Sequence, residues 1–307
     1  MSDNRAIWTR RRCLRGAACA GLVLAGCGTT PRPPVTEVPT APALPQPVPR
    51  PPRIGLVLGG GAARGFAHIG VIQVLEEQGI RPDLVVGTSA GSLVAAMWAS
   101  GKSGVELGSL ADSMDESALT DWMYPGRGVL RGEGLARYVR QHTEGRQIEA
   151  MKIPLGIVAT DLGSGEAILF RRGDPGVAVR ASSAVPALFE PVRIGTREYV
   201  DGGLVAPVPV QFARQMGAEL VIAVDISAAT EGQPTGDALK MLLQTFAIMG
   251  RNLGQYQLRD ADVVMRPKLQ GVSGADFGAR RLSVLAGREA ALMVLADLRA
   301  RIAAKTH

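Results

Sequence analysis

The chain has 307 residues, of which 46% are hydrophobic and 4% aromatic, enough for one substantial core or at most two domains. Its formal net charge of +6 is concentrated at the N-terminus, because residues 1–27 contain five arginines and one acidic residue. The remainder has 29 basic and 27 acidic residues, a net charge of +2, and no basic run with interleaved aromatic residues. Composition and charge therefore exclude a nucleic-acid-binding protein.

Residues 1–27 have the pattern of an export signal. A basic segment precedes an apolar stretch of small residues, about 16–25, that is too short to span a bilayer. The run Leu24-Ala25-Gly26-Cys27 resembles the lipobox of bacterial lipoproteins, in which the cysteine is acylated and becomes the new N-terminus. We therefore expect an exported lipoprotein, anchored through Cys27 to the outer membrane or to the periplasmic face of a membrane. An ordinary signal peptide that contains a cysteine is the alternative.

A proline-rich segment follows the signal. Ten of the 26 residues from Gly28 to Arg53 are proline, which predicts an extended polyproline II linker with a reach of roughly 80 Å. The folded domain is expected over residues 54–307. The three cysteines, Cys13, Cys19 and Cys27, all precede it, so this domain has no disulfide, thiolate metal ligand or thiol nucleophile.

Apolar strands and helices alternate after residue 53. The pattern predicts strands at 54–58, 83–87, 153–159, 166–170, 192–194, 198–200, 220–224 and 263–266. It predicts helices at 63–78, 90–99, 132–142, 177–184, 236–258 and 281–304. Lys240, Arg251 and Gln255 favour an amphipathic core helix over a membrane span for 236–258. The alternation predicts an α/β fold of three α/β/α layers, with a mostly parallel central sheet.

The segment Gly87-Thr88-Ser89-Ala90-Gly91 is a G-x-S-x-G motif between a predicted strand and a predicted helix. A serine at such a sharp turn projects its hydroxyl away from the sheet, and the crowded backbone requires residues without Cβ two positions before and after it. The dipole at the start of the following helix would stabilise an oxyanion. This context predicts that Ser89 is a nucleophile.

A serine nucleophile needs a general base, and the three histidines are poorly placed to supply one. His68 lies one turn into the first predicted helix, where packing or a polar contact is expected. His142 lies at a polar helix end, and His307 is the last residue. The residues therefore favour a Ser-Asp dyad over a Ser-His-Asp triad.

Asp161, Asp201 and Asp225 each follow an apolar strand and are the candidates for the base. Asp201 stands out because Gly202 and Gly203 follow it and allow the backbone to bend close to another loop. A simple Asp-Gly-Gly turn is the alternative interpretation of these residues.

Three consecutive glycines, Gly59, Gly60 and Gly61, precede the first predicted helix, where backbone N–H groups can face a negative atom. A phosphate-binding loop would use the same geometry. The dinucleotide fingerprint fails, however, because Arg64 follows and no acidic residue ends a strand about 20 positions later, and the Walker pattern is also absent. Because a serine turn follows the next strand, these glycines are predicted to form an oxyanion hole.

These motifs together resemble those of patatin-like phospholipases, especially bacterial members. The segments Gly59–Gly65, Gly87–Gly91 and Asp201–Gly203 have that family's order and approximate spacing, and the resemblance covers about residues 54–270. It implies the patatin-like fold, a Ser89–Asp201 dyad, an oxyanion hole from the 59–64 loop, and Arg64 as the anchor of that loop. It also implies hydrolysis of acyl esters in lipids without a cofactor or a metal.

Two positions depart from the family's pattern. Ala62 stands where glycine would be expected, and Ala206 stands where a polar residue such as asparagine would be, so the loop after Asp201 is expected to be held differently. The expected activity is that of a phospholipase- or lysophospholipase-type carboxylesterase that forms an acyl-enzyme. A lipid transacylase and a catalytically silent, lipid-anchored scaffold are the alternatives, and intact Ser89 and Asp201 argue against the scaffold.

Overall fold

The computed structural model describes residues 50–114, 130–228, 236–274 and 276–306. The predicted signal segment with Cys27 lies outside the described residues, as do most of the predicted linker and His307. The chain divides into two units, Met1–Pro47 and Val48–His307, and the described residues all belong to the second. All the apolar clusters described below lie in the second unit, which therefore carries the core that it needs to fold by itself.

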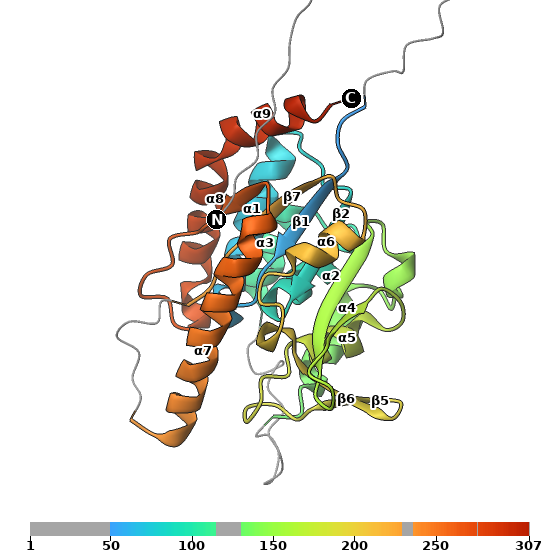
Figure 1. The fold of residues 1–307 in the computed structure, drawn as a ribbon, viewed down its shortest axis with the longest axis vertical. Helices are drawn as coiled ribbons and strands as arrows, with labels where there is room; N and C mark the ends of the chain where they lie inside the picture. Colours follow the sequence, from blue (N-terminus) through green and yellow to red (C-terminus); the bar gives the residue numbers. More distant parts are fainter. Residues whose placement is uncertain (1–49, 115–129, 229–235, 275, 307) are drawn as a thin grey trace, which may run out of the picture. The chain divides into compact units, whose positions relative to one another are not determined.

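A mixed sheet forms the centre of this second unit (Figure 1). In the described part of the chain its strands are β1 (Ile54–Leu58), β2 (Leu84–Thr88), β3 (Leu155–Asp161), β4 (Ala167–Phe170), β5 (Val192–Ile194), β6 (Arg197–Asp201), β7 (Leu220–Val224) and β8 (Val263–Met265). Their order is β5-β6-β3-β2-β1-β7-β8, and β4 also pairs with β3. The run from β3 to β8 is parallel, whereas β4 and β6 pair antiparallel with β3, and β5 pairs antiparallel with β6.

Successive residues of the central strands point to two different apolar clusters, because side chains alternate between the faces of a sheet. On β1, Leu56 and Leu58 join the larger cluster, whereas Val57 joins the cluster on the opposite face. Every residue of β1, β2 and β7 is buried, as expected of parallel strands that are covered on both faces. This arrangement confirms the predicted α/β fold with a mostly parallel sheet.

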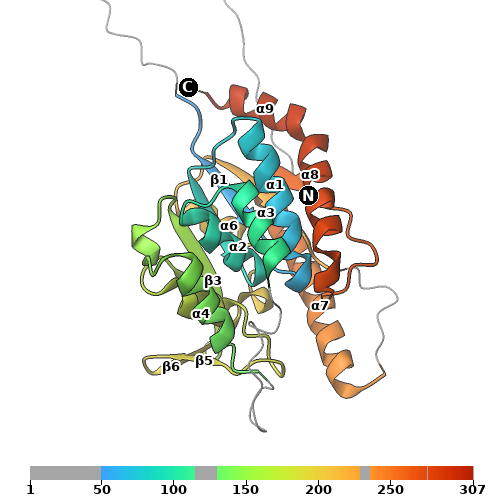
Figure 2. The ribbon, with the colours of Figure 1, turned by 180° about the vertical axis from the view of Figure 1, so that it is seen from behind.

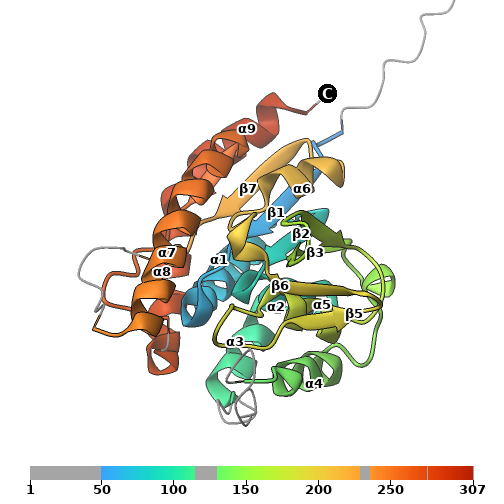
Figure 3. The same cartoon turned by 60° about the horizontal axis from the view of Figure 1, so that its bottom comes forward.

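Helices cover the two faces unequally (Figures 1 and 2). The larger cluster includes residues of α1 (Phe66–Glu77), α2 (Ala90–Ala99), α3 (Gly104–Ser113), α4 (Glu133–His142), α5 (Pro175–Ser182), α8 (Arg280–Met293) and α9 (Leu295–Ala304). The opposite face is covered by α6 (Val210–Gln215) and by the short turn η5 (Leu258–Asp260), which ends α7 (Ala238–Gln257) (Figure 3).

Several elements differ from the predicted ones. The first helix begins as a 3-10 turn, η1 (Ala62–Gly65), and the predicted 281–304 helix is two helices that meet at Val294. Neither α3 nor α6 has a counterpart among the predicted elements.

The prediction of a core helix at 236–258 is wrong, because α7 buries only Gly254. An amphipathic pattern shows that a helix has two faces, but it does not show what covers the apolar one. No helix among the described residues is long and apolar enough to cross a bilayer.

The helices α1 and α8 cross at very short range because each contributes a glycine to the contact. A Cβ added to Gly70 would lie 1.9 Å from the carbonyl oxygen of Val284, and a Cβ added to Gly287 would lie 1.9 Å from that of Ala67. The two backbones therefore touch where no side chain intervenes.

We expect Gly70→Ala to lower the free energy of unfolding by at least ~2 kcal/mol, because the new methyl group would force α1 and α8 apart. The matched control is Gly108→Ala in α3, where the new Cβ would meet only the end of the Gln73 side chain, at 3.1 Å. Replacing that helical glycine should be neutral or should stabilise by up to about 1 kcal/mol. Denaturant unfolding compares the two, and wild-type stability in Gly70→Ala would contradict the close crossing.

Candidate active site

Ser89 occupies a strained turn between β2 and α2. Its backbone has φ 52° and ψ −124°, a conformation that a residue with a Cβ rarely adopts. Such a conformation costs on the order of 1–3 kcal/mol and persists only where the surrounding structure enforces it. The strain is the one expected of a nucleophile held at a strand-to-helix turn.

Gly87 and Gly91 make this turn possible. A Cβ on Gly87 would lie 2.4 Å from the carbonyl oxygen of Gly91, and a Cβ on Gly91 would lie 2.1 Å from that of Leu58. Both distances are far below van der Waals contact. The predicted need for residues without Cβ on either side of Ser89 is therefore met at both positions.

Asp201 is the candidate base that the fold brings to Ser89. It ends β6, whose antiparallel pairing places Asp201 opposite Ala159 of β3. Ser89 Oγ donates a hydrogen bond of 2.7 Å to Asp201 Oδ2, and the Gly203 N–H donates one of 2.6 Å to Asp201 Oδ1. A Cβ on Gly202 would lie 2.3 Å from the carbonyl oxygen of Val158, so glycine is what allows this close approach.

The other two aspartates have structural partners. Asp161 accepts hydrogen bonds from the backbone N–H groups of Gly163 and Ser164 and forms an ion pair with Arg197, so it fixes the turn after β3. Asp225 accepts from the Ser227 N–H and pairs with Arg266 at 3.4 Å.

Burial raises the pKa of Asp201 from its ordinary value of 3.8 to about 6, although the hydrogen bonds from Ser89 and from the Gly203 N–H act in the opposite direction. The carboxylate loses hydration in the interior, and two donors replace only part of it. A carboxylate with a pKa near 6 is a stronger proton acceptor than an exposed one and is still ionised at neutral pH.

His68 does not face Ser89. Its Nε2 donates a hydrogen bond of 2.8 Å to the carbonyl oxygen of Gly59, and the ring is fully buried. Burial lowers the pKa of His68 to about 4, so the ring is neutral at physiological pH. The residue is a polar contact under the glycine loop, in agreement with its prediction. His142 lies in α4, where its ring contacts that of Tyr138 in a tilted arrangement.

The glycine loop lies directly beside Ser89, but not all of its N–H groups are available. The Gly59 N–H donates to Val224 O at 3.1 Å and the Gly60 N–H to Pro207 O at 2.9 Å. Within the described residues, the N–H groups of Gly61 and Ala62 have no acceptor. Of the three glycines predicted to form an oxyanion hole, Gly59 and Gly60 use their N–H groups to position the loop, which leaves the N–H groups of Gly61 and Ala62 available.

Arg64 ties this loop to the segment after β7. Its Nε donates a hydrogen bond of 2.9 Å to the carbonyl oxygen of Ile226, and burial lowers the pKa of the guanidinium from its ordinary value. A Cβ on Gly61 would lie 2.7 Å from the Ile226 side chain, so loop and segment are in close contact. This geometry fits the role of an anchor that the sequence resemblance implies for Arg64.

Three hydroxyl groups whose roles the sequence did not indicate hold Ser89, Asp201 and the loop after β6 in place. Ser182 Oγ accepts the Ser89 N–H at 2.8 Å and donates to Val158 O at 2.5 Å. Thr160 Oγ1 donates to Asp201 O at 2.8 Å, and Thr88 Oγ1 donates to Ala206 O at 2.8 Å. The only signal for the threonines was a hydroxyl inside an otherwise apolar strand.

The Thr88 bond also explains Ala206. No polar side chain is needed at this position, because the backbone of Ala206 is held on both sides. Its N–H donates to Gly202 O at 2.8 Å, and its carbonyl oxygen accepts from Thr88. The loop after Asp201 is thus fixed through the backbone.

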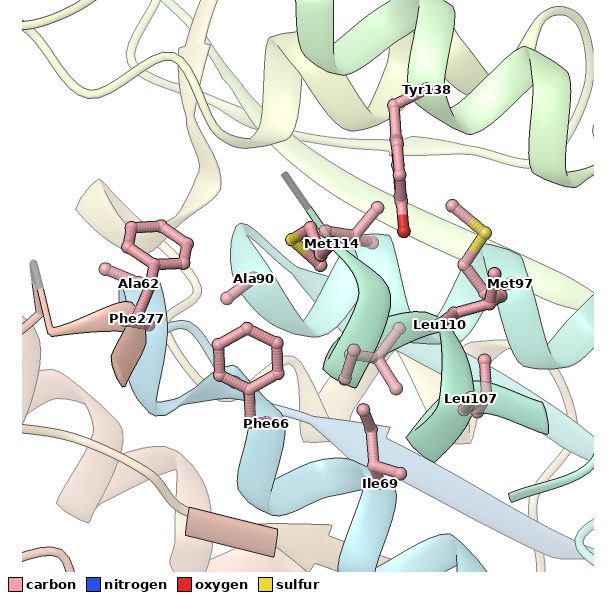
Figure 4. A pocket seen from close by; sticks show the side chains of 15 residues that line it. Ala62, Phe66, Ile69, Ala90, Met97, Leu107, Leu110, Met114, Tyr138 and Phe277 are labelled. Carbon is pink, nitrogen blue, oxygen red and sulfur yellow. The ribbon is translucent and has the colours of Figure 1, made fainter. Parts of the chain in front are cut away.

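Two cavities adjoin at Ala62. The first is an open cleft that contains Ser89 and Asp201 and has residues of α7 along one wall. The second is an apolar cavity between α1, α2 and α3 (Figure 4). It is lined by Ala90, the residue after Ser89, and Tyr138 supplies its one polar side chain among the described residues. The described part of the chain contains no group of three His, Cys, Asp or Glu side chains that could hold a metal ion.

Fold and site together define an α/β protein with a nucleophile-turn serine and an aspartate partner. The family model described as "Patatin-like phospholipase" matches residues 56–214, and the chain belongs to this family. An uncharacterized NTE family protein of Mycobacterium tuberculosis is 37% identical over 190 residues, which cover 61% of this chain and 52% of that protein. Patatin-like phospholipase domain-containing protein 6 of Homo sapiens is 34% identical over 186 residues, 58% of this chain and 14% of that protein.

The chain thus spans about half the length of its mycobacterial relatives and a smaller part of the human one. Among solved structures, VipD from Legionella pneumophila has a similar fold, with a TM-score of 0.53 and 15% sequence identity. The match covers 81% of this chain and 68% of VipD.

We expect Asp201→Asn to be more stable than the wild type above about pH 7, by up to ~3 kcal/mol. The folded pKa of about 6 exceeds the ordinary value of 3.8, so between these values the unfolded state loses its proton first and stability falls as pH rises. The gain of the variant should disappear below about pH 4, where both states hold the proton.

Asp161→Asn is the matched control for this measurement. Hydrogen bonds from the Ser164 N–H and other donors lower the pKa of Asp161, so its carboxylate contributes stability at neutral pH. This variant should lose stability above the ordinary pKa rather than gain it. Thermal unfolding of both variants across the pH range measures whether each is more or less stable than the wild type. A loss of stability at neutral pH in Asp201→Asn would contradict the cost of burying the carboxylate.

Proposed function

We propose that the protein is a serine acyl hydrolase of lipid esters, a phospholipase- or lysophospholipase-type carboxylesterase. The observation that carries this proposal is the 2.7 Å hydrogen bond from Ser89 Oγ to the buried carboxylate of Asp201 at a strained turn. Membership of the patatin-like phospholipase family supports the lipid substrate class.

In the proposed reaction, Ser89 Oγ attacks the ester carbonyl carbon while its proton passes to Asp201 Oδ2. The N–H groups of Gly61 and Ala62 donate to the carbonyl oxygen as it becomes an oxyanion, and each such donor is worth about 3 kcal/mol. The leaving alcohol takes the proton from Asp201, which leaves an acyl group on Ser89. Water then attacks the acyl-enzyme and gives its proton to Asp201, and the serine regains a proton as the carboxylic acid leaves.

The apolar cavity beside Ala90 suits the acyl chain of such a substrate (Figure 4). Phe66, Ile69 and Leu107 form part of its wall, and nothing in it favours a charged group. Each methylene group that leaves water for this cavity contributes about 0.8 kcal/mol. The cavity therefore favours substrates with a long hydrocarbon chain over short esters.

We expect Ser89→Ala to lower the hydrolysis of a soluble ester by about 10⁴-fold or more, with the fold intact, since alanine fits the turn. Asp201→Asn should lose nearly as much, whereas Asp161→Asn, which removes a carboxylate from a structural turn, should lose far less. A fluorophosphonate probe should label the wild type at Ser89. Wild-type turnover in Ser89→Ala, or a larger loss in Asp161→Asn than in Asp201→Asn, would overturn the dyad.

The pH dependence of the wild type provides a second measurement. Asp201 accepts a proton only as a carboxylate, so kcat/KM should fall as pH drops through its pKa of about 6. Activity that stays constant down to about pH 4 would mean that another group is the base.

We expect Ala111→Leu to change the preference for chain length. Ala111 is buried in α3 and lines the apolar cavity, so the larger side chain would displace about three carbons of the acyl chain. The ratio of kcat/KM for long-chain over acetyl esters should fall at least ~10-fold. Ser109→Leu on the exposed side of the same helix is the matched control and should keep the wild-type ratio. An unchanged ratio in Ala111→Leu would place the acyl chain elsewhere.

We further propose that Cys27 carries lipid and that residues 28–53 link this anchor to the enzyme on the outer membrane or the periplasmic face of a membrane. The sequence pattern of residues 1–27 supports this proposal. Cys27→Ser is expected to convert a protein that only detergent extracts into one that an alkaline wash removes, with unchanged activity toward soluble esters. Wild-type protein that the same wash removes would rule out the anchor.

A further inference from the structure

Helix α7 exposes several large apolar side chains to solvent. Met241 is 58% exposed, Ile248 44% and Met249 61%, although the whole helix is only 20 residues long. Leu239, Leu242 and Tyr256 are exposed as well. In Figures 1 and 3 the first turns of α7 extend past the central sheet. A contiguous apolar surface of this kind marks an interaction site.

Helical geometry separates α7 into three faces. One face, with Phe246, Gly250 and Gly254 at intervals of four residues, lies against the domain: Gly250 is near the carbonyl oxygen of Gly203, and Gly254 is the buried residue of the helix.

The opposite face of α7 is apolar and consists of two rows of side chains with a spacing of seven residues. One row contains Met241 and Ile248, and the other contains Leu242, Met249 and Tyr256. A polar stripe runs between these two faces and contains Lys240, Gln244, Arg251 and Gln255.

The same helix forms a wall of the cleft that contains Ser89. Phe246, Met249 and Arg251 line that cleft, so Met249 belongs both to its rim and to the exposed apolar face. A partner that covers the apolar face is thereby placed at the entrance to the Ser89 hydroxyl.

The polar stripe leads to a positively charged cleft. Arg251 and Gln255 line it together with Arg266 and Lys268, which follow β8, and it adjoins the Ser89 cleft. Among the described residues that line it, Asp225 is the one carboxylate, and it pairs with Arg266 at 3.4 Å. Arginine and lysine side chains in such a cleft suit the phosphates of lipid headgroups.

From this arrangement we propose that α7 is an interfacial helix, which buries its Met241–Ile248–Met249 face in a lipid bilayer and places the basic cleft among anionic headgroups. An apolar face beside a cationic polar stripe is the pattern of helices that lie in the plane of a membrane. The 20 residues of α7 contain no Asp or Glu to repel an anionic surface, and the Asp237–Lys240 pair is confined to its first turn. A second copy would instead bring another basic cleft against this one and would cover the entrance to Ser89.

This inference rests on the proposed function only for its biological role, because membrane binding by α7 is measured without lipid hydrolysis. The protein beginning at Val48, which lacks the predicted anchor, is mixed with vesicles of phosphatidylcholine alone and with one quarter phosphatidylglycerol, then sedimented. We expect binding to the anionic vesicles. Met241→Ser with Ile248→Ser should weaken it at least ~10-fold, because two apolar side chains no longer enter the bilayer. Neither residue lines the Ser89 cleft, so hydrolysis of a soluble ester should remain at the wild-type rate.

The matched control removes two exposed apolar side chains elsewhere: Val105→Ser in α3 with Leu162→Ser after β3, which are 70% and 45% exposed in the wild type. This double variant should bind vesicles like the wild type. Lys268→Gln tests the basic cleft and should weaken binding about fivefold on anionic vesicles, with no change on neutral ones.

Equal vesicle binding by the α7 double variant and the wild type would overturn the proposal. So would a wild type that binds no vesicles and is a dimer by light scattering while the α7 variant is a monomer, because the face would then join two copies. Failure of the proposed function has a different signature: the wild type and Ser89→Ala would both bind vesicles, and neither would release fatty acid.

Discussion

The hydrogen bond between Ser89 and a buried carboxylate is the interaction on which the rest of the site depends. A charged group in the interior is costly, and the raised pKa of Asp201 expresses that cost. Two hydrogen bonds offset part of this cost. Because β6 ends beside β3, the Asp201 carboxylate accepts one from the Gly203 N–H and one from the Ser89 hydroxyl. An isolated Ser-Asp pair in water would gain little free energy from this hydrogen bond, because water competes for both groups. In this site the same pair is held at 2.7 Å in the protein interior, which is the geometry that the proposed nucleophile and base require.

The backbone supplies most of the remaining chemistry. Glycines at 87, 91 and 202 let three backbone segments approach within distances that no Cβ would permit. The loop after β1 is fixed by its own N–H groups at Gly59 and Gly60, which leaves those of Gly61 and Ala62 directed at no protein acceptor in the described part of the chain. In the proposed reaction, donors that are fixed in advance would not need to reorganise when the oxyanion forms.

The unequal covering of the sheet has a functional consequence. The face with α1, α2 and α3 is thick enough to hold an apolar cavity next to Ser89. The thinner side leaves α7 largely exposed along the open cleft. A lipid would therefore meet a solvent-exposed apolar helix at the entrance and an apolar cavity beside the serine, so the hydrophobic effect would favour binding at both places.

The sequence by itself determined the parts of this protein whose signals are local. Strand and helix periodicity established the layered α/β fold, and the spacing of Gly87, Ser89 and Gly91 established the turn, because both depend on residues a few positions apart. The resemblance pointed to Asp201, but the contact itself, between residues 112 positions apart, is made only by the pairing of β6 with β3. The free donors of the glycine loop and the exposure of α7 likewise depend on what packs against each segment, and hydrophobic periodicity carries no information about the partner.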